Sequence, residues 1–77
     1  MAETSIAIEL TRDQALVFFD WLARFNKRNH HDFEDQAEQR ILWDIEADLE
    51  KRVTGLFADD YVERLAAARA RVRDPVD

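Results

Sequence analysis

The segment from Arg12 to Lys27 constrains the fold of this chain most, because apolar side chains surround most of its circumference. At about 100° per residue they cover roughly 260° of arc, whereas a helix that packs a single face on a core needs only about 100°. The polar positions form a narrow strip: Asp13, Asp20, Arg24 and Lys27. We therefore expect this segment to be the central helix, covered on at least two sides, with Phe18, Leu22 and Phe25 in the core.

Capping residues and apolar spacing divide the chain into helices over residues 12–27, 33–54 and 59–73. Thr11 and Gln14 fit a capping box at the start of the first helix. Asp32 is suited to cap the second helix, and Asp59 or Asp60 the third. We expect the helices to run antiparallel.

The stretch Ser5–Leu10 alternates, with Ile6, Ile8 and Leu10 on one side, as in a half-buried strand. A lone strand leaves its backbone hydrogen-bonding groups unpaired. Either it pairs with the same strand of a second chain, or it is an extended arm lying on the helices. The predicted architecture is therefore a single mainly α domain over residues 1–77, with a short N-terminal strand or arm.

A chain of 77 residues with one Gly, one Pro and no Cys has room for few turns and cannot form disulfides. The single glycine, Gly55, is placed to end the second helix in the left-handed conformation. We find neither a signal-peptide pattern nor the ~18 consecutive apolar residues of a membrane span. The expected location is cytoplasmic, with no membrane partner.

The formal net charge is −6, and it is unevenly distributed. Residues 32–50 contain eight acids and one base, Arg40, whereas residues 64–73 contain four arginines and no acid. Such blocks are typical of pairing within a fold or across a symmetric interface. The acidic balance opposes nucleic-acid binding, which needs cations at phosphates. A comparison with ribbon-helix-helix proteins fails, because Ser5, Ala7 and Glu9 would face the bases.

The sequence has no Cys nucleophile and, with one Gly, no glycine-rich phosphate-binding loop. We therefore expect no enzyme activity, no catalytic residues and no cofactor. The weak metal candidates are His30, His31, Asp32 and Glu34, but no histidine pair has the i, i+4 spacing of a helical zinc site. A solvated loop and helix start explains them better. Glu38 falls in line with the apolar face of the second helix, either as a tuned acid or beyond the edge of the core beside a basic residue.

Trp43 is predicted to point away from the apolar stripe formed by Ile41, Leu42, Ile45, Leu49 and Val53. A large exposed aromatic needs a cover, from a partner or from the N-terminal arm or the Leu56–Phe57 segment. We expect it to lie in an interface. The predicted partner-binding residues are Trp43, Arg40, Ala47, Glu46, Glu50 and Trp21.

These features favour a small acidic protein-interaction module that neutralises or regulates a basic partner protein, in the manner of an antitoxin, immunity protein or adaptor. One alternative is a metal- or small-ligand-binding protein using the region from His30 to Glu38. Another is a purely structural homo-oligomer subunit. We expect a homodimer in any case, because the wide apolar arc and the unpaired strand both call for a second chain.

Overall fold

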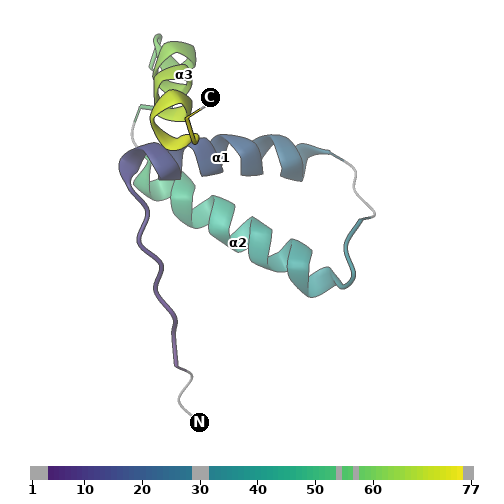
Figure 1. The fold of residues 1–77 in the computed structure, drawn as a ribbon. Coiled ribbons are helices and arrows are strands. Elements are labelled where there is room, and N and C mark those ends of the chain that lie inside the picture. The colour runs from purple at the N-terminus through teal and green to yellow at the C-terminus, as the bar shows by residue number, and fades with distance from the viewer. Residues whose placement is uncertain (1–3, 29–31, 54, 57, 76–77) are drawn as a thin grey trace.

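The computed structural model describes residues 4–28, 32–53, 55–56 and 58–75. It confirms a mainly α architecture of three helices, α1 (Arg12–Lys27), α2 (Gln36–Arg52) and α3 (Tyr61–Val72). Figure 1 shows α1 and α2 side by side, with α3 set across the N-terminal half of α1. The predicted bounds of α1 are confirmed, whereas α2 and α3 are both shorter than predicted at each end.

Helix α1 is the centre of the fold, since it packs on both α2 and α3, whereas in the described part of the chain no Cα atom of α2 lies within 8 Å of one of α3. Leu22 of α1 is fully buried, and Leu49, Leu65 and Ala68 complete the buried core of the described residues. The expected cover on two sides of α1 is therefore confirmed. Phe18 and Phe25 were predicted to be core, but both are only half-buried. Phe18 borders an open hollow beside the N-terminal arm, and Phe25 stacks on the exposed ring of Trp21.

A polar residue, Asn26, fixes how α2 is rotated against α1. Its Nδ2 donates to Glu46 Oε1 at 2.6 Å and to the Leu42 carbonyl at 3.5 Å. These contacts turn Leu42, Glu46 and Leu49 toward α1 and leave Ile41 55% exposed. The predicted place of Ile41 in the buried stripe is wrong, because the half-buried amide needs a hydrogen-bond partner on α2.

Charged and hydroxyl groups attach α3 to α1. Asp20 of α1 accepts hydrogen bonds from Tyr61 Oη at 2.9 Å, from Arg24 Nε at 2.9 Å and from Arg69 Nη2 at 3.3 Å. In the first turn of α1, Asp13 accepts hydrogen bonds from both Nε and Nη2 of Arg71, at 2.7 and 2.9 Å. The Asp13–Arg71 pair joins the start of α1 to the end of α3, while Tyr61 joins the start of α3 to Asp20 further along α1, so the two helices cross in an antiparallel sense.

The N-cap of α2 differs from the predicted one, whereas α3 begins after Asp60, one of its two predicted caps. Asp35, not Asp32, caps α2, and its carboxylate accepts from the Ala37 amide at 2.8 Å. Asp60 stands at the N-cap of α3 but makes no side-chain cap bond, because its carboxylate binds Arg64 Nε at 2.8 Å instead. Gly55 has φ 80°, as its predicted left-handed conformation requires. Phe57 of the predicted Leu56–Phe57 cover lies outside the described residues.

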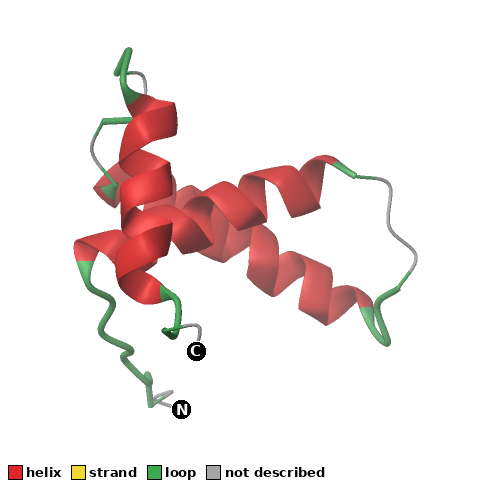
Figure 2. Cartoon of the chain, turned by 45° about the horizontal axis from the view of Figure 1, so that its top comes forward, coloured by secondary structure: helices red, strands yellow, loops and turns green. Residues whose placement is uncertain are grey.

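The N-terminal segment is an extended arm: residues 4–10 form neither helix nor strand. It projects away from the helices rather than lying on them (Figures 1 and 2), and Ile6 and Ile8 are 89% and 82% exposed. The arm thus leaves the apolar side of its alternating pattern uncovered within one chain. Among the described helices, none is both long and apolar enough to cross a membrane.

Candidate interaction surface

The cover of Trp43 comes in part from its own helix. The guanidinium carbon of Arg40 lies 5.5 Å from the centroid of the Trp43 ring, within the range of a cation–π contact. Arg40 is in turn held by Asp44, one turn further along α2. The Trp43 side chain remains 40% exposed. The sequence analysis considered only apolar segments as covers within the chain, namely the N-terminal arm and Leu56–Phe57. It therefore did not predict that the guanidinium group of Arg40 covers the ring.

Ala47 and Glu50 follow Trp43 at helical spacings of four and seven residues and are both exposed. Glu46 lies on the same side of α2 but is half-buried, and one of its oxygens binds Asn26. We call the set Trp43, Ala47 and Glu50, edged by Arg40 and Glu46, the Trp43 surface. It presents an aromatic ring, a small residue and a carboxylate along one side of one rigid helix.

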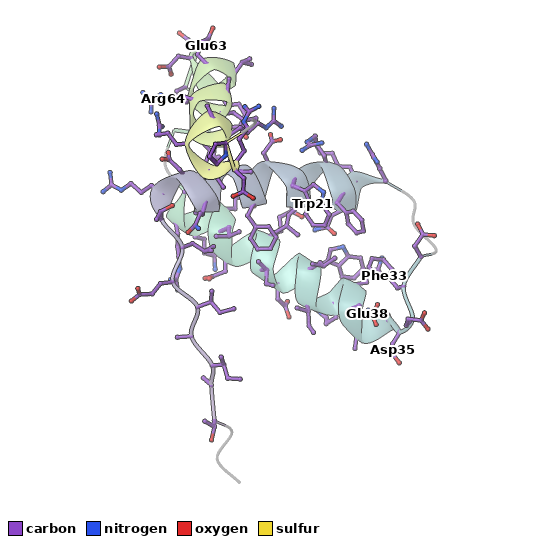
Figure 3. All side chains as sticks on the ribbon, in the orientation of Figure 1. Trp21, Phe33, Asp35, Glu38, Glu63 and Arg64 are labelled. Carbon is purple, nitrogen blue, oxygen red and sulfur yellow. The ribbon has the colours of Figure 1, made fainter. Side chains whose placement is uncertain are left out.

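Trp21 belongs to a separate cluster. Its ring stacks on Phe25 at 4.7 Å and on Phe18 at 6.3 Å, and Phe33 meets Phe25 edge-on at 5.9 Å. Figure 3 shows Trp21 and Phe33 between α1 and α2, toward the loop that connects them. In the described part of the chain the two tryptophans make no ring contact. The sequence analysis placed Trp21 and Trp43 in one set of partner-binding residues. Their exposed fractions are indeed similar (42% and 40%), but similar exposure does not mean that two side chains lie on the same surface.

The acidic block of α2 is not neutralised by the arginines of α3. Arg69 and Arg71 pair with α1, and the ion pairs of α2 are internal: Arg40 with Asp44, and Arg52 with Asp48. Within the described residues the following acids of residues 32–50 form no ion pair: Glu34, Asp35, Glu38, Glu46 and Glu50. Of the two predicted pairings of the charged blocks, the one within a single chain is not found among the described residues, because Arg69 and Arg71 bind α1. Pairing across a symmetric interface stays a prediction.

The region proposed for a metal is only partly described. His30 and His31 lie outside the described residues, while Asp32 and Glu34 are exposed. The described part of the chain brings together no group of three His, Asp or Glu side chains able to hold a metal ion. Glu38 is exposed and accepts a hydrogen bond from the Glu34 amide at 3.1 Å (labelled in Figure 3). It thus lies beyond the core edge, bound to backbone and not to the basic residue expected there.

An apolar hollow of about 1120 Å³ lies where the arm leaves α1. Its walls include Phe18 of α1, Ile45 and Leu49 of α2, Val53 directly after α2, and the arm itself. Charged side chains of α2 and α3 stand among the lining residues. Sequence reasoning did not find this hollow, because it arises from four segments whose relative placement no local pattern encodes.

A scan against protein-family models, a search of curated proteins and a search of solved structures found no match to this chain. Its function is therefore argued from its own residues.

Proposed function

We propose that the protein is a small acidic interaction module that binds a basic partner protein through the Trp43 surface. The observation that supports this most is the unneutralised acidic charge of α2, because two of the four arginines of residues 64–73 are engaged by α1 and Arg64 is engaged by Asp60. A carboxylate at Glu50, two turns along α2 from a half-exposed ring, suits a partner that presents Lys or Arg as well as an apolar side chain. Self-association is the second part of the proposal, favoured by the exposed arm.

Trp43 is suited to anchor such a partner because its ring is held before binding. The Asp44–Arg40–Trp43 series fixes both the cation and the ring on one helix, so little side-chain freedom is lost on association. Tryptophan and arginine are also enriched among residues that contribute most to binding energy. Ala47 beside the ring leaves space for an incoming side chain.

The test compares five full-length immobilised proteins in capture from a lysate of the native host, read by quantitative mass spectrometry. The wild type is set beside Trp43→Ala and Glu50→Lys, each with a matched control. Ile41→Ala truncates another exposed apolar residue of α2, and Glu63→Lys makes the same charge change on α3. Any partner found is then titrated against each variant.

We expect one basic protein to be retained by the wild type and both controls. Trp43→Ala and Glu50→Lys should each weaken its binding at least about ten-fold, equivalent to 1.4 kcal/mol. Retention that is equal on all five proteins, or lost equally with Glu63→Lys, would refute the Trp43 surface as the binding site. Added salt should weaken the complex, since the charged contacts lie at the surface.

A further inference from the structure

The N-terminal arm leaves two physical requirements unmet. No backbone–backbone hydrogen bond involves residues 4–10 in the described part of the chain, although the segment is extended. Its apolar side is also open to solvent, with Ile6 89% and Ile8 82% exposed. An extended segment with free backbone groups and alternating apolar residues is a template for pairing with another strand.

The hollow beside the arm also has an apolar surface that nothing in the described part of the chain covers. It presents apolar walls from α1 and α2, including Phe18, Ile45 and Leu49, to open space of about 1120 Å³. The chain's own arm borders this space, but the high exposure of Ile8 shows that it does not fill it. An additional apolar segment packed against the arm would cover both the apolar side of the arm and the walls of the hollow.

We propose that two copies of this chain pair their arms as a two-stranded antiparallel ribbon, whose apolar face covers both hollows. The pairing is centred on a two-fold axis at Ile8, so that Ile8 faces its counterpart and Ile6 faces Leu10 of the other copy. In this register all the apolar side chains share one face, because side chains alternate with a period of two. Ala7 and Glu9 lie opposite one another on the outer face.

A second copy fits better than an unrelated occupant because the arm is self-complementary. The register centred on Ile8 is unchanged by exchanging the two strands, as an isologous two-fold interface requires. A shift by one residue would put Ile6 and Ile8 opposite residues of the polar side and lose the common apolar face. An isolated two-stranded ribbon is marginal in water unless it packs on another layer, which the hollows supply.

Lysine substitutions at neighbouring positions test the register. Ile8→Lys would bring two like charges together at the axis, which disfavours pairing. Ala7→Lys makes the same change one residue away but meets Glu9 of the other copy. By sedimentation equilibrium the wild type should have twice the chain mass of 9.1 kDa. Ile8→Lys should raise the dimer dissociation constant at least about ten-fold, while Ala7→Lys leaves the dimer intact.

Cysteine cross-linking checks the same geometry, and the natural chain has no Cys to interfere. Directly opposed residues have Cα atoms roughly 4.5–5.5 Å apart, within the range of a disulfide. Ile8→Cys should therefore give a cross-linked dimer under a mild oxidant. Ala7→Cys places its pair on the diagonal, at about 7–8 Å, and should cross-link more slowly.

A wild type that stays monomeric, or a dimer that Ile8→Lys and Ala7→Lys affect equally, would overturn the proposal. Cross-linking of Ala7→Cys as fast as Ile8→Cys would do the same. Circular dichroism should show unchanged helical content in each variant, because the substituted positions lie outside the helices. The ribbon rests on the self-association part of the proposed function but shares no residue with the Trp43 surface. Its failure therefore leaves the binding of a basic partner at that surface standing.

Discussion

At the scale of single residues, Asp20 organises the contact between α1 and α3. Its side chain is only 16% exposed and accepts hydrogen bonds from a phenol and two guanidinium groups. Hydrogen bonds to a charged acceptor are stronger than neutral ones, and removal of the acceptor would leave three donors without this partner. Asp13 has a similar, more exposed role, and its hydrogen bond from Arg71 lowers its pKa below the usual value.

Tyr61 should make stability depend on alkaline pH. Burial, followed by its hydrogen bond to Asp20, raises the pKa of Tyr61 from 10.0 to about 12. The folded state therefore holds this proton more tightly than the unfolded state. Its contribution to the free energy of unfolding is complete below pH 10 and falls as pH rises toward 12. Denaturant titrations across this range should show a steeper decline for the wild type than for Tyr61→Phe.

All other groups are common to both proteins, so the difference between the two declines reports on Tyr61. The chain has one tyrosine, so absorbance of the phenolate follows this residue alone. Appearance of phenolate around pH 10 in the folded wild type would contradict the predicted shift.

At the scale of helices, Asn26 determines which face of α2 packs on α1. Asn26→Asp would place a carboxylate against the Glu46 carboxylate and the Leu42 carbonyl, where an amide now donates. We expect a loss of about 2–3 kcal/mol of unfolding free energy at neutral pH, compared with roughly 1 kcal/mol for Asn26→Ala. Urea denaturation of both variants measures the difference.

The sign of the pH dependence distinguishes repulsion from lost packing. Repulsion raises the pKa of the new carboxyl group in the folded state, so protonation should restore stability as the pH falls to about 4. Asn26→Ala introduces no carboxyl group, so its loss of unfolding free energy relative to the wild type should change little with pH. If both variants lose the same stability at both pH values, Asn26 does not act through its hydrogen bonds.

The helices also show how far local patterns determine a fold. The start of α1 was predicted because Thr11 and Gln14 form a reciprocal capping box, confirmed at 2.9 and 3.0 Å. The start of α2 was not, because Asp32 and Asp35 are equally good caps and the choice between them is not local. The rotation of α2 depends on Asn26, far away in sequence, so the exposed Ile41 and the separation of Trp21 from Trp43 could not be predicted.

At the scale of the whole molecule, the chain is more open than its length suggests. Its radius of gyration is 14.6 Å, whereas a compact domain of this length has a value of roughly 11–12 Å. The projecting arm contributes to this difference (Figure 1). A compact dimer has a radius of gyration of about 15 Å, so this quantity does not separate an open monomer from a dimer. Molecular mass is the measurement that does.

Thermal stability should therefore depend on protein concentration. The described core has four buried residues, so a single chain of this size is marginally stable and a paired ribbon should add to its stability. Raising the concentration 100-fold should raise the melting temperature by about 5–10 °C, from a mass-action contribution of roughly 2.7 kcal/mol per dimer. Ile8→Lys should melt at a temperature independent of concentration, whereas Ala7→Lys should follow the wild type. Calorimetry over this 100-fold range of concentration measures the effect. A wild-type melting temperature that does not change with concentration, or one for Ile8→Lys that changes as much, would contradict the coupling of dimerisation to stability.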